Sequence, residues 1–233
     1  MLLQALSGWK VQLYETFIVD DNYLLLVDGL KNTIIITLGA LAIGVVLGTL
    51  VSVVKFMAED NPVLKPFAVV CNIYVTAVRG IPVVVLLLLF YFVILRSADG
   101  VVTGIVTFGI NSGAYMAEIV RSGIEAVEHG QTEAARSLGM SRLQAMRFVV
   151  LPQGVKNILP AIGNEMIALL KETAVAGYVA VQDLTRGANL IRNNTFDAFN
   201  PLVATALVYL AMVVVLTSLM GRLERRLRRS DVR

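Results

Sequence analysis

The chain has 233 residues, of which 57% are hydrophobic and only 16% charged, a composition too apolar for a water-soluble domain and typical of a protein that crosses a membrane several times. Its net charge of +3 is too small to indicate a nucleic-acid partner. Its single cysteine, Cys71, excludes an internal disulfide and a cysteine-based metal cluster. We therefore expect an all-α membrane protein, formed by a single transmembrane domain over residues 1–233.

Residues 1–28 are predicted to form a short helix that lies on the bilayer surface before the first span. Apolar residues recur there at near-helical spacing, and Trp9, Tyr14 and Tyr23 are aromatic residues of the kind that favours the membrane interface. A frayed terminus is the alternative.

Five segments are predicted to cross the membrane: 29–55, 66–95, 101–128, 153–180 and 198–221. In the first, the uncharged run from Asn32 to Val54 is long enough, at about 1.5 Å per residue, to cross roughly 30 Å of hydrocarbon. Gly44 and Gly48 lie four positions apart in this run, a spacing that allows another helix to approach closely.

The second segment, 66–95, is too long for a simple span, because a straight helix of this length would run roughly 45 Å. Its one charged residue, Arg79, precedes Gly80, Ile81 and Pro82 near the middle, where glycine and proline would kink or break a helix. We expect one long broken span, and two short re-entrant halves are the alternative.

The third and fourth segments are the more polar ones. The third, 101–128, is rich in small residues, and its Glu118 and Arg121 have the three-residue spacing at which charged side chains pair on a helix. The fourth, 153–180, contains Asn157, Asn164, Glu165, Lys171 and Glu172. A helix this polar is expected to face other helices or an aqueous path, because lipid would not solvate it.

The distribution of basic residues predicts the orientation in the membrane. Arginine is frequent in residues 129–152 and in the tail after residue 221, and cytoplasmic segments carry an excess of basic residues. Five spans put the termini on opposite sides, so we expect the N-terminus outside and the C-terminus in the cytoplasm. Residues 183–197, before the last span, are expected to be a polar loop.

Residues 129–152 form a polar, basic island that is predicted to fold as two short helices. Thr132 is a candidate N-cap that would place Glu133 in the first turn of a helix ending at Gly139, the residue type that most easily adopts a left-handed C-terminal cap. Ser141 can cap the second helix. Pro152 either ends that helix or opens the next one.

This island resembles the EAA loop of ABC importer permeases. The match consists of Glu133-Ala134-Ala135, then Gly139 after three residues, then Val149-x-Leu151-Pro152 after nine more; the family prefers isoleucine at the position of Val149. The flanking sequences resemble the polar amino-acid branch of that family at Gly130-Gln131, Gln153, Arg79-Gly80-x-Pro82 and Lys171-Glu172-Thr173. The resemblance covers about residues 30–220, and an ordinary amphipathic cytoplasmic loop is the alternative for the island itself.

The resemblance implies a type I, MetI-like permease of five transmembrane helices with a cytoplasmic coupling-helix loop at 129–152. That loop would dock into a cleft on a separate ATP-binding cassette subunit, which would bind the ATP and magnesium. Glu133 and Arg136 would make charged contacts at its rim, Ala134 and Ala135 would permit close approach, and Gly139 would set the bend. The sequence has no Walker-type phosphate loop and no catalytic Ser-His-Asp set, so we expect neither enzymatic activity nor a cofactor in this chain.

The resemblance further implies a substrate-binding protein, a homodimer or a heterodimer with a similar permease, a place in the cytoplasmic membrane, and a polar amino acid as cargo. Arg79, Glu165, Lys171 and Glu172 are ionisable residues at expected membrane depth, which makes them candidates for substrate binding. A cation there could meet the carboxylate of an amino acid, and a carboxylate could meet its ammonium group. Two carboxylates favour a cationic cargo, and the family also includes glutamine permeases. Structural pairing of Lys171 and Glu172 between spans is the alternative.

Two other functions are consistent with a multi-spanning chain. A secondary transporter would be expected to contain two internal repeats, and the sequence has none. A membrane scaffold that recruits a soluble partner would not need the charged fourth span.

Overall fold

The computed structural model describes residues 2–228 of the chain, apart from the side chains of residues 2–7 and 228, and all regular structure in that part is helical. This confirms the all-α prediction. The α-helices are α1 (Leu2–Phe17), α2 (Tyr23–Ala58), α3 (Lys65–Gly80), α4 (Val83–Leu89), α5 (Gly100–Glu125), α6 (His129–Ser137), α7 (Arg142–Ala145), α8 (Leu151–Glu172), α9 (Leu184–Thr195) and α10 (Phe199–Arg228). Short 3-10 turns η1 (Val19–Asp21), η2 (Pro62–Leu64) and η5 (Thr173–Val179), and π-helical turns η3 (Phe90–Ile94) and η4 (Met146–Val150), join them.

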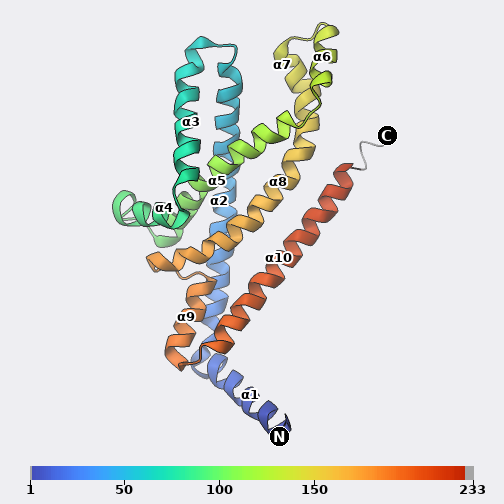
Figure 1. Ribbon diagram of the computed structural model, residues 1–233. Coiled ribbons are helices and arrows are strands. Elements are labelled where there is room, and N and C mark those ends of the chain that lie inside the picture. Colours follow the sequence, from blue (N-terminus) through green and yellow to red (C-terminus); the bar gives the residue numbers. More distant parts are fainter. Residues whose placement is uncertain (1, 229–233) are drawn as a thin grey trace.

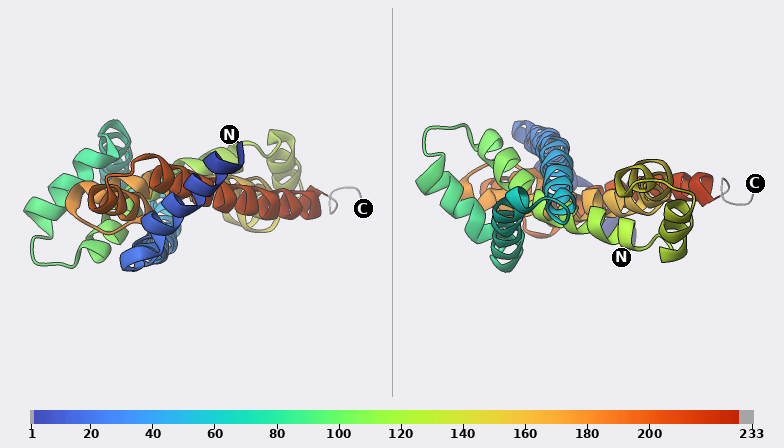
Figure 2. Two further views of the ribbon diagram at one scale, coloured as in Figure 1. Left: turned by 90° about the horizontal axis from the view of Figure 1, so that it is seen from below. Right: turned by 90° about the horizontal axis from the view of Figure 1, so that it is seen from above.

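The molecule is elongated, with different elements gathered at its two ends. Figure 1 shows the α2–α3 turn and helices α6 and α7 at one end, and α1 and α9 at the other. Helix α10 runs from the α9 end toward the α6–α7 end, so the N-terminal helix and the C-terminal end of α10 lie at opposite ends of the molecule. The end-on views separate the two ends, with α1 nearest in one and α6 and α7 near in the other (Figure 2).

Helices α2 and α5 pack against each other along the centre of the molecule, and small residues set their separation. A Cβ atom at Gly44 would lie 2.7 Å from Ser112 Oγ, and one at Gly48 would lie 2.3 Å from Met116 Cβ. Both distances are too short for a real side chain, so the backbones approach as the Gly44–Gly48 spacing predicts. Phe108 of α5 is fully buried, in a core cluster that also contains Ile36 and Ala40 of α2.

The 66–95 segment breaks at the predicted place. Helix α3 ends at Gly80, Ile81 has an extended backbone, and α4 begins after Pro82. Proline has no backbone N–H to donate and restricts the residue before it to extended conformations, which explains why the helix stops here. That the two halves together form one crossing stays a prediction, with two re-entrant halves as the alternative.

By length and composition, three helical stretches of the described residues are apolar enough to cross a membrane: Val19–Ala58, Pro62–Gly80 and Phe199–Leu227. Helices α5 and α8 are long enough, but their polar and charged residues reduce their mean hydropathy. The predicted count of five spans and the predicted span boundaries therefore stay predictions.

Residues 183–197 were expected to be a polar loop, and this prediction was wrong. Most of the segment forms α9, which begins after Asp183, whose side chain accepts hydrogen bonds from the backbone N–H groups of Thr185 and Arg186 at 2.9 and 3.1 Å. The buried face of α9 consists of Leu184, Gly187, Ala188 and Ile191. Four small or apolar residues at helical spacing are enough for packing against α2, but they are too few to stand out among the polar residues of α9.

Helix α1 covers most of the segment predicted to form an N-terminal helix, and it is attached to the beginning of α10. The Trp9 indole N–H donates to Asn200 Oδ1 at 3.1 Å, and Thr16 Oγ1 donates to Asp197 Oδ2 at 2.7 Å. Its position on the bilayer surface stays a prediction. The basic tail lies partly on α10, and its residues Arg229 and Arg233 lie outside the described residues.

Candidate functional site

The first candidate site is the α6–α7 loop, and its first helix begins earlier than expected. Helix α6 starts at His129 with Glu128 as the N-cap residue, so Thr132 lies inside the helix and Glu133 lies beyond the first turn. The prediction that Thr132 caps the helix was therefore wrong. The Glu128 side chain makes no capping hydrogen bond, and the start of α6 is exposed, so water can satisfy the free N–H groups of the first turn. His129 Nδ1 lies 3.1 Å from Glu133 Oε1 on the outer face of the helix.

Gly139 ends α6 as predicted, in the left-handed region with φ +87°. The backbone N–H of Gly139 donates to Arg136 O at 3.0 Å, and that of Met140 donates to Ala135 O at 3.2 Å. These are the two hydrogen bonds of a Schellman cap. No atom lies within 4 Å of a Cβ built at Gly139, so the glycine is needed for its backbone conformation and not for space.

Helix α7 is held by the cap that the sequence predicts. Ser141 Oγ accepts a hydrogen bond from the Gln144 backbone N–H at 3.2 Å, and the Gln144 side chain accepts one from the Ser141 backbone N–H at 2.8 Å. This reciprocal pair is a capping box. The helical path continues from α7 through η4 into α8, where Pro152 occupies the first turn, so Pro152 opens α8.

The residues expected to couple to an ATPase do not all face outward. Glu133, Ala134, Arg136 and Gly139 are exposed, whereas Ala135 is 4% exposed and packs inward. Arg136 also donates to Met140 O at 2.8 Å, which braces the turn around Gly139.

Two exposed apolar side chains on this loop were missed by the sequence analysis. Leu138 is 81% exposed and Leu143 is 67% exposed. The sequence did indicate them, because Leu138 directly precedes the bend glycine and Leu143 lies inside the turn that Ser141 caps.

The second candidate site lies between α5 and α8. Glu165 and Glu172 are two turns apart on α8 and both point toward α5. Ser112 Oγ donates to Glu165 Oε1 at 2.9 Å, and Asn111 Nδ2 lies 3.4 Å from Glu172 Oε2. The structure thus brings two predicted carboxylates together with two uncharged polar residues, Asn111 and Ser112, to which the sequence analysis gave no role in binding. The occurrence of these two polar residues in a glycine-rich, apolar segment was the feature of the sequence that could have indicated a role in binding.

Lys171 faces away from the two carboxylates. It is exposed, and within the described part of the chain it makes no hydrogen bond or ion pair to another helix, whereas Glu172 contacts Asn111 of α5. Lys171 shares a face of α8 with Asn164 and Asn157, which precede it at seven-residue intervals and are also exposed. Neighbouring residues on a helix point about 100° apart, which separates Lys171 from Glu172.

Arg79 belongs to a different group of residues. Its Nη1 lies 3.9 Å from Glu118 Oε2, and its guanidinium carbon lies 5.2 Å from the ring centroid of Tyr115. Glu118 also accepts a hydrogen bond from Arg121 Nε at 3.0 Å, as its spacing predicts. Glu118 is six residues beyond Ser112, or about 9 Å along α5. Arg79, Tyr115 and Glu118 line a cavity of about 350 Å³, and neither Glu165 nor Glu172 is among its lining residues.

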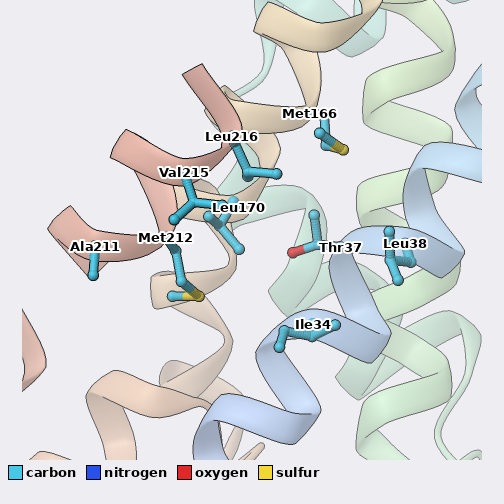
Figure 3. A pocket seen from close by; sticks show the side chains of 9 residues that line it. All are labelled: Ile34, Thr37, Leu38, Met166, Leu170, Ala211, Met212, Val215 and Leu216. Carbon is cyan, nitrogen blue, oxygen red and sulfur yellow. The ribbon is translucent and has the colours of Figure 1, made fainter. Parts of the chain in front are cut away.

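An apolar cavity of about 400 Å³ lies between α2, α8 and α10. Figure 3 shows the side chains that line it, which are Ile34, Thr37, Leu38, Met166, Leu170, Ala211, Met212, Val215 and Leu216. The one hydroxyl group among them, on Thr37, donates to Thr33 O at 2.7 Å. A charged amino acid would lose its hydration here without gaining hydrogen bonds, so this cavity does not suit a polar cargo.

Comparisons with known proteins agree on one family. A family model described as "Binding-protein-dependent transport system inner membrane component" matches residues 44–229. The chain is 35% identical over 216 residues to "Probable glutamine ABC transporter permease protein GlnM" of Bacillus subtilis (strain 168), covering 91% of this chain and 98% of the relative. It is 34% identical over 210 residues to "Arginine transport system permease protein ArtQ" of the same organism, covering 88% of this chain and 94% of the relative.

Solved structures are similar as well. A chain from "Crystal structure of an amino acid ABC transporter with histidines" is 40% identical with a TM-score of 0.83, covering 90% of this chain and 98% of that one. A chain from an inward-facing MetNI methionine ABC transporter is 22% identical with a TM-score of 0.75, covering 88% and 97%, and supports the fold alone. The chain therefore belongs to the family of binding-protein-dependent transport system inner membrane components and has the all-helical, MetI-like fold of ABC transporter permeases.

Proposed function

We propose that this chain is the membrane permease subunit of an ABC importer that carries a polar amino acid into the cell. The observation that carries the proposal is the capped α6–α7 loop, which has the EAA spacing and lies in a chain of the permease family. The relatives named for glutamine and arginine, and the solved amino-acid transporter, support an amino acid as the cargo.

The arrangement of the helices supports a proposed membrane topology. Helices α2, α5, α8 and α10, together with the broken α3–α4 segment, are proposed to be the five crossings. The basic loop and the end of α10 lie at one end of the molecule, which is proposed to be the cytoplasmic end, while α1 is proposed to lie outside (Figure 1). The membrane is the cytoplasmic membrane, and a second permease chain, identical or similar, completes the path.

The exposed face of the α6–α7 loop is proposed to dock on the ATP-binding subunit. Leu138 and Leu143 would supply apolar contact, and Glu133 and Arg136 would make charged contacts at the rim. The continuous helical path from α7 into α8 then links this surface to the Glu165–Glu172 region. The partner subunit supplies the nucleotide and magnesium, and a substrate-binding protein delivers the cargo.

The cargo is proposed to contact α8. The carboxylates of Glu165 and Glu172 suit an ammonium or cationic side chain, and Lys171 on the neighbouring face suits a carboxylate of a cargo held between two permease chains. Arg79 is proposed to act closer to the cytoplasmic end, in the cavity that it shares with Glu118.

Reconstitution tests the function. The permease, its ATP-binding subunit and its binding protein would be placed in lipid vesicles, and uptake of labelled arginine, lysine, histidine and glutamine would be measured with and without ATP. ATP-dependent uptake of one of these amino acids is expected. Uptake driven by an ion gradient without the ATPase would indicate a secondary transporter, and absence of uptake under every condition would contradict the proposal.

A further inference from the structure

A single arginine joins the α6–α7 loop to the turn between α2 and α3. Arg142, the first residue of α7, bonds through Nη2 to Glu59 Oε2 and through Nη1 to Asp60 Oδ1, the latter at 2.5 Å. Its guanidinium carbon also lies 4.8 Å from the ring centroid of Phe56, near the end of α2. One planar cation therefore holds two carboxylates and an aromatic ring, all from one short stretch of the chain.

A cavity of about 470 Å³ lies beside this contact. Arg142 and Phe56 form part of its wall, and most of the remaining wall comes from the end of α5, from α6 and from the residues that join them. Phe56 is the only residue of α2, a helix that the structure describes in full, that lines it, so the cavity does not add a second contact with the α2–α3 turn.

The solvent exposure of Arg142, Glu59 and Asp60 indicates that their contact sets geometry and adds little to folding stability. The side chain of Arg142 is 36% exposed, and those of Glu59 and Asp60 are 63% and 65% exposed. Exposed ion pairs add little to folding stability. A contact made by three groups at once still fixes the direction and separation of the elements that it joins, and this geometric effect does not depend on a large stabilisation.

We propose that Arg142 is a positioning residue that carries the movement of the α6–α7 loop to α2 and α3, so that the loop acts on these two helices as well as on α5 and α8, with which it is continuous in the chain. The inference rests on the proposed function, since it assumes that the loop is moved by an ATPase. Helix α2 packs along α5, and α3 leads to Arg79 and the break at Pro82. The contact made by Arg142 therefore reaches α3, which carries Arg79, and through α2 it also reaches α5, which carries Glu118.

The first test measures the geometry and needs no transport. Spin labels would be attached to cysteines at Val63, in the α2–α3 turn, and at Gly130, on α6, in a Cys71→Ser background; Val63 is 74% exposed, and the nearest atom to a Cβ at Gly130 is 4.0 Å away. The assembled transporter should show a narrow distance distribution that broadens or shifts with Arg142→Gln. The matched variant Arg147→Gln, whose guanidinium lies over Phe148 in the same loop, should leave the distribution unchanged. An unchanged distribution in Arg142→Gln would overturn the proposal.

The second test measures coupling as the number of amino acids transported per ATP hydrolysed. Arg142→Gln should lower this ratio at least about fivefold, the lower end of usual coupling effects, while the ATP-binding subunit still binds. If Arg142 acts through the two carboxylates, Glu59→Gln combined with Asp60→Asn should lower the ratio similarly, and adding Arg142→Gln should cause no further loss. Additive losses would mean that Arg142 contacts the ATPase directly and would overturn the proposal.

The two tests also separate this inference from the proposed function. If the unmodified transporter carries no amino acid, the proposed function fails, whereas the distance measurement still decides whether Arg142 holds the loop to the turn. If transport occurs and Arg142→Gln leaves the coupling ratio intact, the proposed function stands and this inference fails.

Discussion

Ser112 on α5 donates a hydrogen bond of 2.9 Å to Glu165 on α8, across the interface between these two helices. Glu172, two turns further along α8, lies 3.4 Å from Asn111, a long distance for a hydrogen bond. Glu165 is thus already engaged within the chain, while Glu172 is the carboxylate more available to a ligand.

This difference predicts how the two carboxylates contribute to cargo binding. Glu172→Gln keeps the shape of the side chain and removes its charge, and the loss of a hydrogen bond to a charged group costs about 1.5–3 kcal/mol. We expect the apparent affinity for a cationic amino acid to fall roughly ten- to a hundredfold, and Glu165→Gln to have a smaller effect. The apparent affinity is measured from the uptake of labelled amino acid into vesicles that contain the transporter, with the binding protein present.

The control for this prediction is a variant of Leu216, which lines the apolar cavity between α2, α8 and α10. Leu216→Met is close to volume-conserving and should leave both affinity and selectivity unchanged. Equal uptake and equal selectivity between cationic and neutral amino acids in Glu172→Gln would show that Glu172 has only a structural role.

The bend at Gly139 predicts a loss of coupling. Gly139→Leu would place a side chain at φ +87°, a conformation that costs a non-glycine residue roughly 1–3 kcal/mol. The Schellman cap should open and tilt α6, so ATP-driven uptake should fall strongly while the protein still inserts in the membrane. Co-purification with the ATPase and uptake in vesicles measure the effect.

Gly130 offers a matched control for that variant. It lies inside α6, and the nearest atom to a Cβ there is Glu128 Oε1 at 4.0 Å. Gly130→Ala should keep coupling and raise helix stability by roughly 0.5–1 kcal/mol. Normal coupling in Gly139→Leu would contradict the proposed role of the bend.

The attachment of α1 predicts a pH dependence. Partial burial acts to raise the pKa of Asp197, but hydrogen bonds from Thr16, Asn200 and backbone N–H groups outweigh it, and the pKa lies below its ordinary value of 3.8. For a depressed pKa, the stabilisation is fully present above the unfolded-state value and is lost as the pH falls through the folded-state value. The contact should therefore persist at neutral pH and loosen only below about pH 4.

Trp9 is the only tryptophan of the chain and reports this change directly, because its indole N–H donates to Asn200. Its fluorescence emission should shift when the pH falls below about 4 and should return when the pH is raised. In Asp197→Asn the shift should be absent and the emission at neutral pH should already resemble the acid form. A shift centred near neutral pH would contradict the assignment to Asp197.

The proposed orientation predicts which end reacts with reagents that cannot cross a membrane. In a Cys71→Ser background, a cysteine at Gly8 should react with an impermeant thiol reagent in intact cells, since no atom lies within 4 Å of a Cβ there. A cysteine at Arg226, which is exposed on α10, should react only after the cells are opened. Labelling of Arg226→Cys in intact cells would reverse the proposed orientation.

Features that depend on a few neighbouring residues could be predicted from the sequence. The break before Pro82, the left-handed Gly139 and the cap at Ser141 follow from backbone and side-chain chemistry that acts over four residues or fewer. The close approach of another helix at Gly44 and Gly48 could also be predicted, because glycines four positions apart in an apolar helix leave one face without side chains. Composition alone was enough for the all-helical membrane class.

The tertiary structure decided which side chains meet. It separated Arg79 from Glu165 and Glu172, gave those two carboxylates partners on α5, and joined Arg142 to Asp60 across 82 positions of sequence. Such contacts depend on how each helix is rotated and where it crosses its neighbours, and many residues together set both quantities. Packing also explains why residues 184–195 form helix α9. The short apolar face of α9 is stabilised only by contact with α2, and this contact cannot be read from the sequence of α9 itself.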